Sequence, residues 1–275
     1  MIETLFYIIS FLLGLIIGSF LNVVIYRQNT GRGILGRSFC FACRAQLSPF
    51  DLVPVFSFLR LRGRCRTCYS RISIQYPLVE LLTGFVFALL AWQYFPFDRF
   101  GALSIQALIV LFLYWTIAGI LIVITVYDFK HKIIPDDFTY AFIILAVFVP
   151  FLERLPAGLG EALARTGNGI LAAGLLFAIF WALWRYSDGR WMGFGDVKLV
   201  IGIGLLLGLL TGLTAVFIAF WSGAIVGLLL ILLGRLRFFK KITGGLTLKS
   251  ELPFAPFLVL ATLLGLIFQF NLLWF

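Results

Sequence analysis

Long stretches of apolar residues, separated by short polar segments, dominate this chain. An apolar run of about 20 residues is long enough to cross the hydrocarbon core of a bilayer as an α-helix. The first such run has no basic segment before it and no small-residue cleavage site after it, so we predict that it is retained as a membrane anchor. Runs with few or no charged residues predict membrane-spanning helices at 4–25, 75–94, 102–127, 133–151, 167–184 and 254–275.

Residues 199–234 form a further apolar run that is too long for one crossing. At about 1.5 Å per residue, a single helix of this length would reach roughly twice the thickness of the hydrocarbon core. We therefore expect the run to fold back on itself, with Thr211-Gly212 as the predicted turn. The whole pattern predicts an all-α polytopic membrane protein with about eight transmembrane helices.

The composition leads to the same class of protein. Of the 275 residues, 62% are hydrophobic and only 12% are charged, and the mean hydropathy is +1.06. A soluble domain of this length cannot bury so much apolar surface. Lipid is therefore an expected partner of the chain.

The basic residues are unevenly distributed between the predicted loops. Nineteen of the 22 Lys and Arg residues fall in four loops that alternation of the spans places on one side. Because cytoplasmic loops of membrane proteins are enriched in Lys and Arg, we predict that these loops are cytoplasmic and that both termini lie outside. A nucleic-acid-binding face is the other interpretation of the +10 net charge. Since topology accounts for the charge, we expect no nucleic-acid partner.

The first basic loop, residues 27–72, contains all four cysteines, as Cys40-x-x-Cys43 and Cys65-x-x-Cys68. Two such pairs about 20 residues apart are typical of a tetrahedral site for structural Zn²⁺. The loop has few aliphatic residues, and bound metal would supply folding free energy directly. Two disulfides, redox-active cysteines or free thiols remain the alternatives, although a reducing cytoplasm disfavours disulfides.

Two aspartates lie at the ends of predicted membrane helices. Asp128 follows the third predicted span, 102–127. Asp196 lies at the start of the sixth predicted helix, directly after Gly193-Phe194-Gly195. A carboxylate at such a position is energetically costly and marks a candidate functional site. Both helix ends fall on the predicted cytoplasmic side, so we expect the carboxylates to meet there. Gly193 and Gly195 allow the close backbone approaches that a Cβ hinders.

Two carboxyl groups that meet can share one proton. One then acts as a general base on water, while the protonated partner polarises a carbonyl. We assign Asp196 as the base and Asp128 as the acid in the resting state. Two alternatives remain open from the residues alone: Asp196 is a helix cap, or the pair forms a proton or cation pathway in a transporter.

Several motifs of this chain resemble those of one family. Tyr127-Asp128 together with Gly193-x-Gly195-Asp196 resembles the GxGD class of intramembrane aspartyl proteases. Within that class, nearly the whole chain resembles the type IV prepilin peptidases, also called leader peptidase/N-methyltransferases. The matching pieces are Gly18 to Arg27, the two cysteine pairs, Tyr76 to Leu81, Asp128 with Ile134-Pro135-Asp136, Gly193 to Leu199, and Leu252 to Phe257.

The resemblance implies an enzyme of the bacterial inner membrane. Such an enzyme removes the basic leader of type IV prepilins or type II secretion pseudopilins after a glycine, with Asp128 and Asp196 as the catalytic pair. Many members also methylate the new N-terminus with S-adenosylmethionine, a role associated with the large first loop. The Pro-rich segment is expected to support the active site through Pro253, and it departs from the family in having Ala255 where glycine is usual.

Glu80 lies in the apolar span 75–94 and needs a partner there. It either forms a structural hydrogen bond or ion pair with an arginine of the first loop, or contacts the amino terminus of the substrate or the methyl donor. The resemblance divides the chain into a first helix (1–26), a methyltransferase-associated zinc loop (27–72) and a seven-helix peptidase domain (73–275). The alternative function is an ion- or proton-coupled transporter or scaffold whose zinc loop serves for docking.

Overall fold

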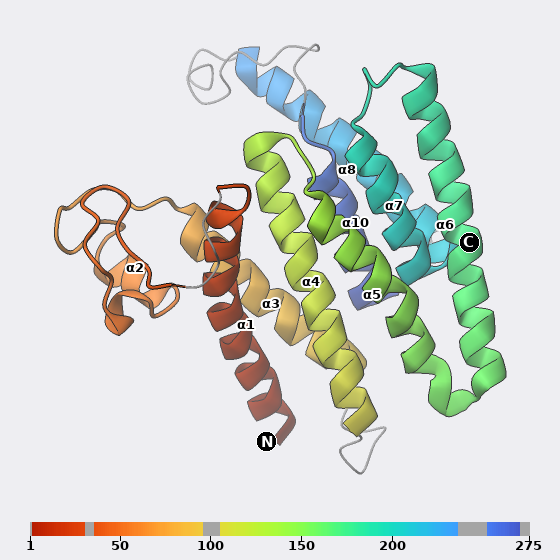
Figure 1. Cartoon of the computed structure of the whole chain (residues 1–275), viewed down its shortest axis with the longest axis horizontal. Helices are drawn as coiled ribbons and strands as arrows, with labels where there is room; N and C mark the ends of the chain where they lie inside the picture. The colour runs from red at the N-terminus through yellow and green to blue at the C-terminus, as the bar shows by residue number, and fades with distance from the viewer. Residues whose placement is uncertain (1, 31–35, 96–104, 236–251, 270–275) are drawn as a thin grey trace. The chain divides into compact units, whose positions relative to one another are not determined.

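The computed structural model describes residues 2–30, 36–95, 105–235 and 252–269, and these residues are helical with no β-strand. Parts of two predicted spans (102–104 and 270–275) and the basic residues at 32, 99, 237, 240, 241 and 249 lie outside them. The long helices are α1 (Ile2–Arg27), α3 (Gln75–Tyr94), α4 (Ile105–His131), α5 (Asp136–Arg154), α6 (Leu159–Tyr186), α7 (Phe194–Leu207), α8 (Leu209–Arg235) and α10 (Ala255–Phe268) (Figure 1).

The predicted helical class is confirmed. Six of these helices are long and apolar enough to cross a membrane. The other two, α7 and α10, have 14 residues each. A helix of that length rises about 21 Å, which is less than the roughly 30 Å of a hydrocarbon core. These two short helices therefore end or begin within the depth of the bilayer.

The chain divides into two compact units, residues 1–123 and 124–275. In the first unit, α1 and α3 pack closely because small residues face each other. A Cβ on Gly14 would lie 2.7 Å from the Cα of Gly84, and such glycine contacts are common where membrane helices approach closely. The indole N–H of Trp115 in α4 donates to the carbonyl of Phe87 in α3 over 2.9 Å.

Residues 36–74 of the first unit form the loop domain between α1 and α3. It contains the 3-10 helix η1 (Pro49–Asp51) and the short helix α2 (Phe56–Arg60). Two isolated antiparallel bridges, Phe39 with Gln46 and Arg64 with Arg71, each close a turn around one cysteine pair. The loop domain therefore has little secondary structure of its own.

In the second unit, α7 lies against α5 and α6 (Figure 1). Glycines on both sides of the α6–α7 contact allow the approach. A Cβ on Gly204 would lie 2.5 Å from the backbone nitrogen of Ala173, and a Cβ on Gly169 would lie 2.6 Å from the carbonyl oxygen of Leu205. Gly202 makes room for the ring of Phe142 on α5 in the same way. The helix that carries Asp196 is thus held between two neighbours.

The predicted turn at Thr211-Gly212 is wrong, because the long apolar run turns at Gly208 instead. Gly208 adopts φ +77°, a conformation that favours glycine. Two polar side chains of α6 bond the backbone on either side of it. Arg165 donates to the carbonyl of Leu206 over 2.7 Å, and Asn168 accepts from the N–H of Leu209 over 2.7 Å. These partners from another helix decide the position of the turn.

Candidate functional site

Asp128 lies in the last turn of α4. This helix continues past the predicted end at Tyr127 to His131. Lys132 then adopts φ +53° and donates its N–H to the carbonyl of Asp128 over 2.8 Å, which ends the helix in a left-handed cap. The Asp128 side chain is 5% exposed. The candidate acid is therefore buried, one turn before the end of its helix.

Asp196 lies in the first turn of α7, and its side chain is 7% exposed. Gly193 is the N-cap residue of α7, and its carbonyl accepts the N–H of Asp196 over 3.2 Å. One carboxylate oxygen of Asp196 has no hydrogen-bond partner among the described residues. A buried polar atom of this kind usually has a partner such as water or a ligand. This oxygen of Asp196 is therefore available to bind water or a ligand.

The two glycines before Asp196 have different roles. A Cβ on Gly195 would lie 2.9 Å from the Cβ of Ile134, so the missing side chain lets α7 begin directly against the segment that precedes α5. A Cβ on Gly193 would instead meet the Asp196 carboxylate at 3.9 Å, an ordinary contact. Gly193 thus leaves space beside the carboxylate rather than relieving a clash.

Asp128 and Asp196 come together within the second unit. The two carboxyl groups are near enough for the charge of Asp128 to influence the carboxyl group of Asp196. Lys198 follows Asp196 in the same turn of α7. Its positively charged ammonium group pairs with Asp136 at the start of α5 and not with Asp196. Two buried carboxyls that interact without sharing that cation are suited to holding one proton between them.

The start of α10 contributes a group that sequence reasoning missed. The backbone N–H of Ala255 donates to the carboxylate of Asp128, and Ala255 is the first residue of α10. The first N–H groups of a helix have no partner within the helix and lie at its positive end. Pro253 is half-buried just before this helix start. The proline-rich sequence signalled a helix start, but nothing in it pointed to Asp128.

The four cysteines of the loop domain form one cluster. Their sulfur atoms all lie within 4.8 Å of one another, and those of Cys40 and Cys68 are 3.8 Å apart. A metal ion at about 2.3 Å from four thiolates in a tetrahedron places neighbouring sulfurs about 3.8 Å apart. A disulfide needs about 2 Å, and the four thiols are free. The geometry therefore fits a four-thiolate metal site.

Both cysteine pairs are held by the same backbone turn. The N–H of Cys40 bonds the carbonyl of Ala45, and the N–H of Cys65 bonds that of Ser70, each over 2.9 Å. The residues after the second cysteine of each pair, Arg44 and Tyr69, have φ +58° and +60°. Two matching turns therefore present the four sulfurs to one point.

Neighbouring groups favour the thiolate form of Cys40 and Cys68, which is the form that metals require. The N–H of Cys43 donates to the sulfur of Cys40 and lowers the pKa of the Cys40 thiol to about 6. The thiol of Cys68 donates to the hydroxyl oxygen of Ser70 over 3.2 Å, and the side-chain and backbone hydrogen bonds with Ser70 lower the pKa of the Cys68 thiol. Such outer-shell donors also orient metal ligands.

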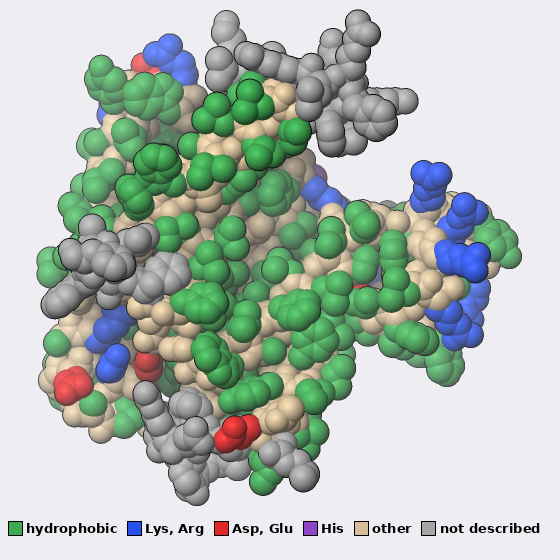
Figure 2. Space-filling view, turned by 180° about the vertical axis from the view of Figure 1, so that it is seen from behind, with side chains coloured by type: hydrophobic (Ala, Val, Ile, Leu, Met, Phe, Trp, Pro, Cys, Tyr) green, Lys and Arg blue, Asp and Glu red, His purple; other side chains and the backbone are tan. Residues whose placement is uncertain are grey.

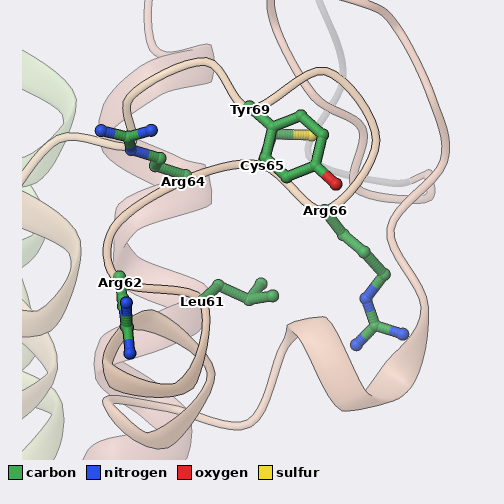
Figure 3. A pocket seen from close by; sticks show the side chains of 6 residues that line it. All are labelled: Leu61, Arg62, Arg64, Cys65, Arg66 and Tyr69. Atoms are coloured by element: carbon green, nitrogen blue, oxygen red, sulfur yellow. The ribbon is translucent and has the colours of Figure 1, made fainter.

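A cavity of about 530 Å³ lies beside the second cysteine turn (Figure 3). Three arginines share its lining with one metal-site cysteine. The guanidinium of Arg66 pairs with Asp51 of η1 over 2.7 Å. The lining residues are Leu61, Arg62, Arg64, Cys65, Arg66 and Tyr69. The cavity is therefore suited to anions.

Glu80 is buried in the second turn of α3, at 6% exposure. Its carboxylate accepts the backbone N–H of Val55 over 2.7 Å and is hydrogen-bonded by Ser19 of α1. Glu80 therefore bonds the first loop, but through the backbone of Val55 and not through an arginine as predicted. A contact of Glu80 with substrate or methyl donor stays a prediction.

The fold and these sites define a multi-pass helical membrane protein that carries a buried aspartate pair and a four-cysteine cluster. Residues 12–94 match the Bacterial Peptidase A24 N-terminal domain, and residues 115–228 match the Type IV leader peptidase family. The chain belongs to the type IV leader peptidase family.

Relatives similar over nearly their whole length carry the name "Prepilin leader peptidase/N-methyltransferase". The protein from Bacillus subtilis (strain 168) is 33% identical over 94% of this chain and 93% of its own length. That from Pectobacterium carotovorum subsp. carotovorum is 32% identical over 94% and 92%, and that from Neisseria gonorrhoeae is 29% identical over 79% and 80%. No solved structure shows significant similarity to the chain.

Proposed function

We propose that this protein is an aspartyl endopeptidase that removes the basic leader of type IV prepilins or type II secretion pseudopilins, and that it methylates the new N-terminus. The observation that carries the peptidase activity is the pair of buried, interacting carboxyls of Asp128 and Asp196. The family and the names of the relatives support the same activity.

The pair acts as base and acid on one water molecule. The ionised carboxylate, assigned to Asp196, takes a proton from water as the water oxygen attacks the scissile carbonyl carbon. The protonated carboxyl, assigned to Asp128, donates its proton to the carbonyl oxygen. When the tetrahedral intermediate collapses, the proton held by Asp196 passes to the leaving amine, and Asp128 regains its proton from the hydroxyl. Each turnover therefore returns both carboxyls to their starting states.

The surroundings of the pair support these roles. The N–H of Ala255 donates to Asp128, which fixes the direction of that carboxyl group. Asp196 keeps one carboxylate oxygen without a partner among the described residues, as a base that must bind water requires. Gly193 leaves room beside it for an extended substrate backbone. Pro253 supports the site by setting the start of α10.

The substrate fits a site at helix ends near the membrane surface. A prepilin carries an apolar helix preceded by a short basic leader, and that helix packs against the enzyme within the bilayer. We assign cleavage after the glycine at the cytoplasmic edge of the helix. This assignment places the enzyme in the inner membrane with both termini outside and the loop domain in the cytoplasm, as the distribution of Lys and Arg predicts.

The loop domain serves the methylation step. The name N-methyltransferase of the relatives implies S-adenosylmethionine as the methyl donor. We assign Zn²⁺ to Cys40, Cys43, Cys65 and Cys68, because their sulfur geometry fits a tetrahedral ion. The ion supplies folding free energy to a domain with few secondary-structure elements. It has a structural role, since all four cysteines are used as ligands.

The test is mass spectrometry of a prepilin incubated with the full-length enzyme, with and without S-adenosylmethionine. Asp128→Asn and Asp196→Asn are each expected to abolish leader removal while leaving the metal content unchanged. Asp137→Asn is the matched control, because Asp137 is exposed in the first turn of α5. Cleavage at the normal rate by either of the first two variants rejects the catalytic pair.

A further inference from the structure

The loop domain contains an exposed apolar segment that the proposed reaction does not use. We define this apolar segment as residues 49–61, which include η1 and α2. Phe50 is 72% exposed, Phe56 is 60% exposed and Leu59 is 67% exposed. Leu52 and Val53 are also exposed. Large apolar side chains that cluster on a surface in this way mark an interaction site.

Two of these side chains are arranged to enter a single apolar environment. Phe56 and Leu59 are three residues apart on α2 and therefore share one face of the helix. Phe58 points the other way and covers Gly63, where a Cβ would lie 3.0 Å from its ring. The segment thus has an inner side that packs on the loop domain and an outer side with no partner among the described residues.

A hydrogen bond fixes the height of the apolar segment along a membrane helix. Its central residue, Val55, donates its N–H to the carboxylate of Glu80 over 2.7 Å. Glu80 is the sixth residue of α3, which begins at Gln75, so the contact lies about 8 Å along the helix from its start. Amphipathic segments that lie in a membrane surface bury their apolar face to about 5–10 Å.

The side chains around this anchor indicate what surrounds it. On α3, Leu78 and Leu82 are exposed at the same height as the Glu80–Val55 contact, and Ile74 is exposed just before the helix. A span-length helix with exposed leucines at this height has lipid as its neighbour. A membrane surface near the start of α3 would place the apolar segment where acyl chains begin.

Charge complementarity identifies the kind of lipid. Arg60 lies near the end of the apolar segment, Arg62 and Arg64 follow it, and all three are exposed. Arginine side chains gather on the loop domain at the right of Figure 2. Basic residues beside an apolar face attract the negative cytoplasmic leaflet, each contributing about 1 kcal/mol near the surface. Asp51, the acidic residue of the segment, is already paired with Arg66.

We infer that the apolar segment docks into the headgroup region of an anionic lipid leaflet, with Phe50, Phe56 and Leu59 among the acyl chains and the flanking arginines on the phosphates. The loop domain then lies on the membrane surface rather than free in the cytoplasm. Glu80 acts as the positioning residue, because it holds Val55 in a φ of +60°, which a β-branched residue rarely adopts.

Photo-crosslinking of the full-length protein in lipid nanodiscs tests this docking. The photoreactive amino acid p-benzoylphenylalanine replaces Phe56 in one variant and Tyr69 in another. Tyr69 is the matched control, because it is an aromatic residue of the same loop domain with 70% exposure and lies on the second cysteine turn instead. We expect lipid adducts at position 56 to exceed those at position 69 several-fold, and to be more abundant with phosphatidylglycerol than with phosphatidylcholine.

Two further variants separate docking from misfolding. Glu80→Ala removes the acceptor for the N–H of Val55 and should lower the lipid adducts at position 56 several-fold, whereas Glu80→Gln keeps an acceptor oxygen and should restore them. Unchanged metal content shows that the loop domain is folded in each case. Equal lipid labelling at positions 56 and 69, or adducts at position 56 only with a second copy of the chain or with prepilin, overturns the inference.

Discussion

The contact between α6 and α7 makes a quantitative prediction for Gly204→Ala. A Cβ at this position would lie 2.5 Å from the backbone nitrogen of Ala173 and 2.6 Å from its Cα, whereas ordinary contacts begin at 3.4 Å. Because both neighbours are backbone atoms, no rotamer change relieves the clash. The helices must separate by about 0.9 Å, the difference between 2.5 and 3.4 Å.

This separation has a stability effect and an activity effect. Overpacking of a well-packed contact costs about 1–3 kcal/mol, and replacing glycine by alanine within a helix returns up to about 1 kcal/mol. We expect a net loss of about 1–2 kcal/mol. Asp196 lies eight residues earlier on the same helix and moves with it. A displacement near 1 Å at a catalytic group lowers the rate by up to about 100-fold.

The assay combines thermal unfolding in detergent with the rate of prepilin cleavage. Gly174→Ala is the matched control, because Gly174 lies on the same α6 next to Ala173 and an added Cβ there meets no atom within 4 Å. The control should keep its cleavage rate and unfold at the same or a higher temperature. Normal cleavage and stability in Gly204→Ala would show that this close contact does not position Asp196.

Three more predictions follow from single contacts. Arg165→Met removes the donor to the Leu206 carbonyl at the end of α7 and should lower the free energy of unfolding by about 1–3 kcal/mol, with partial rescue by Arg165→Lys as the check. Cys65→Ser, or treatment with a strong chelator, should lower bound zinc measured by elemental analysis and speed hydrogen exchange of the loop domain, while Ser57→Ala should leave both unchanged. Burial opposes the shift in Asp51, but hydrogen bonds from Ser48 and the charge of Arg66 lower the pKa of Asp51 below its usual value. A lowered native pKa stabilises the fold above the unfolded pKa of about 3.9, and this stabilisation is lost as the pH falls below that value. The difference in free energy of unfolding between the unchanged protein and Asp51→Asn should therefore be constant near neutral pH and disappear below about pH 4.

The membrane helices and the four-cysteine cluster are features that the sequence predicted well. Hydropathy is a local property, and an apolar stretch of sufficient length has few alternatives to a membrane helix because its backbone groups must bond one another in lipid. The two cysteine pairs are equally local, since each pair sits in one short turn. The spacing of the cysteines at 40–43 and 65–68 was therefore enough to predict that their four sulfur atoms come together.

Errors occurred where a distant partner sets the end of a helix. The apolar run 199–234 contains no charged residue that marks a turn, and the break was predicted at Thr211-Gly212. The structure turns at Gly208, because Arg165 and Asn168 of another helix bond the backbone there. In the same way, α4 continues beyond Tyr127 to a cap at Lys132 that the span length did not predict.

By itself, the sequence determined the class of protein, the approximate helices and the cluster of four cysteines, and it marked the two aspartates as candidates, because each depends on residues close together in the chain. Only the tertiary structure decided how those groups are used. The N–H of Ala255 on Asp128, the glycine contacts that hold α7 and the Glu80 anchor for Val55 all join residues that are distant in sequence. Such contacts depend on how helices pack, and helix packing depends on shape complementarity across elements, which a linear pattern of apolar and polar residues does not contain.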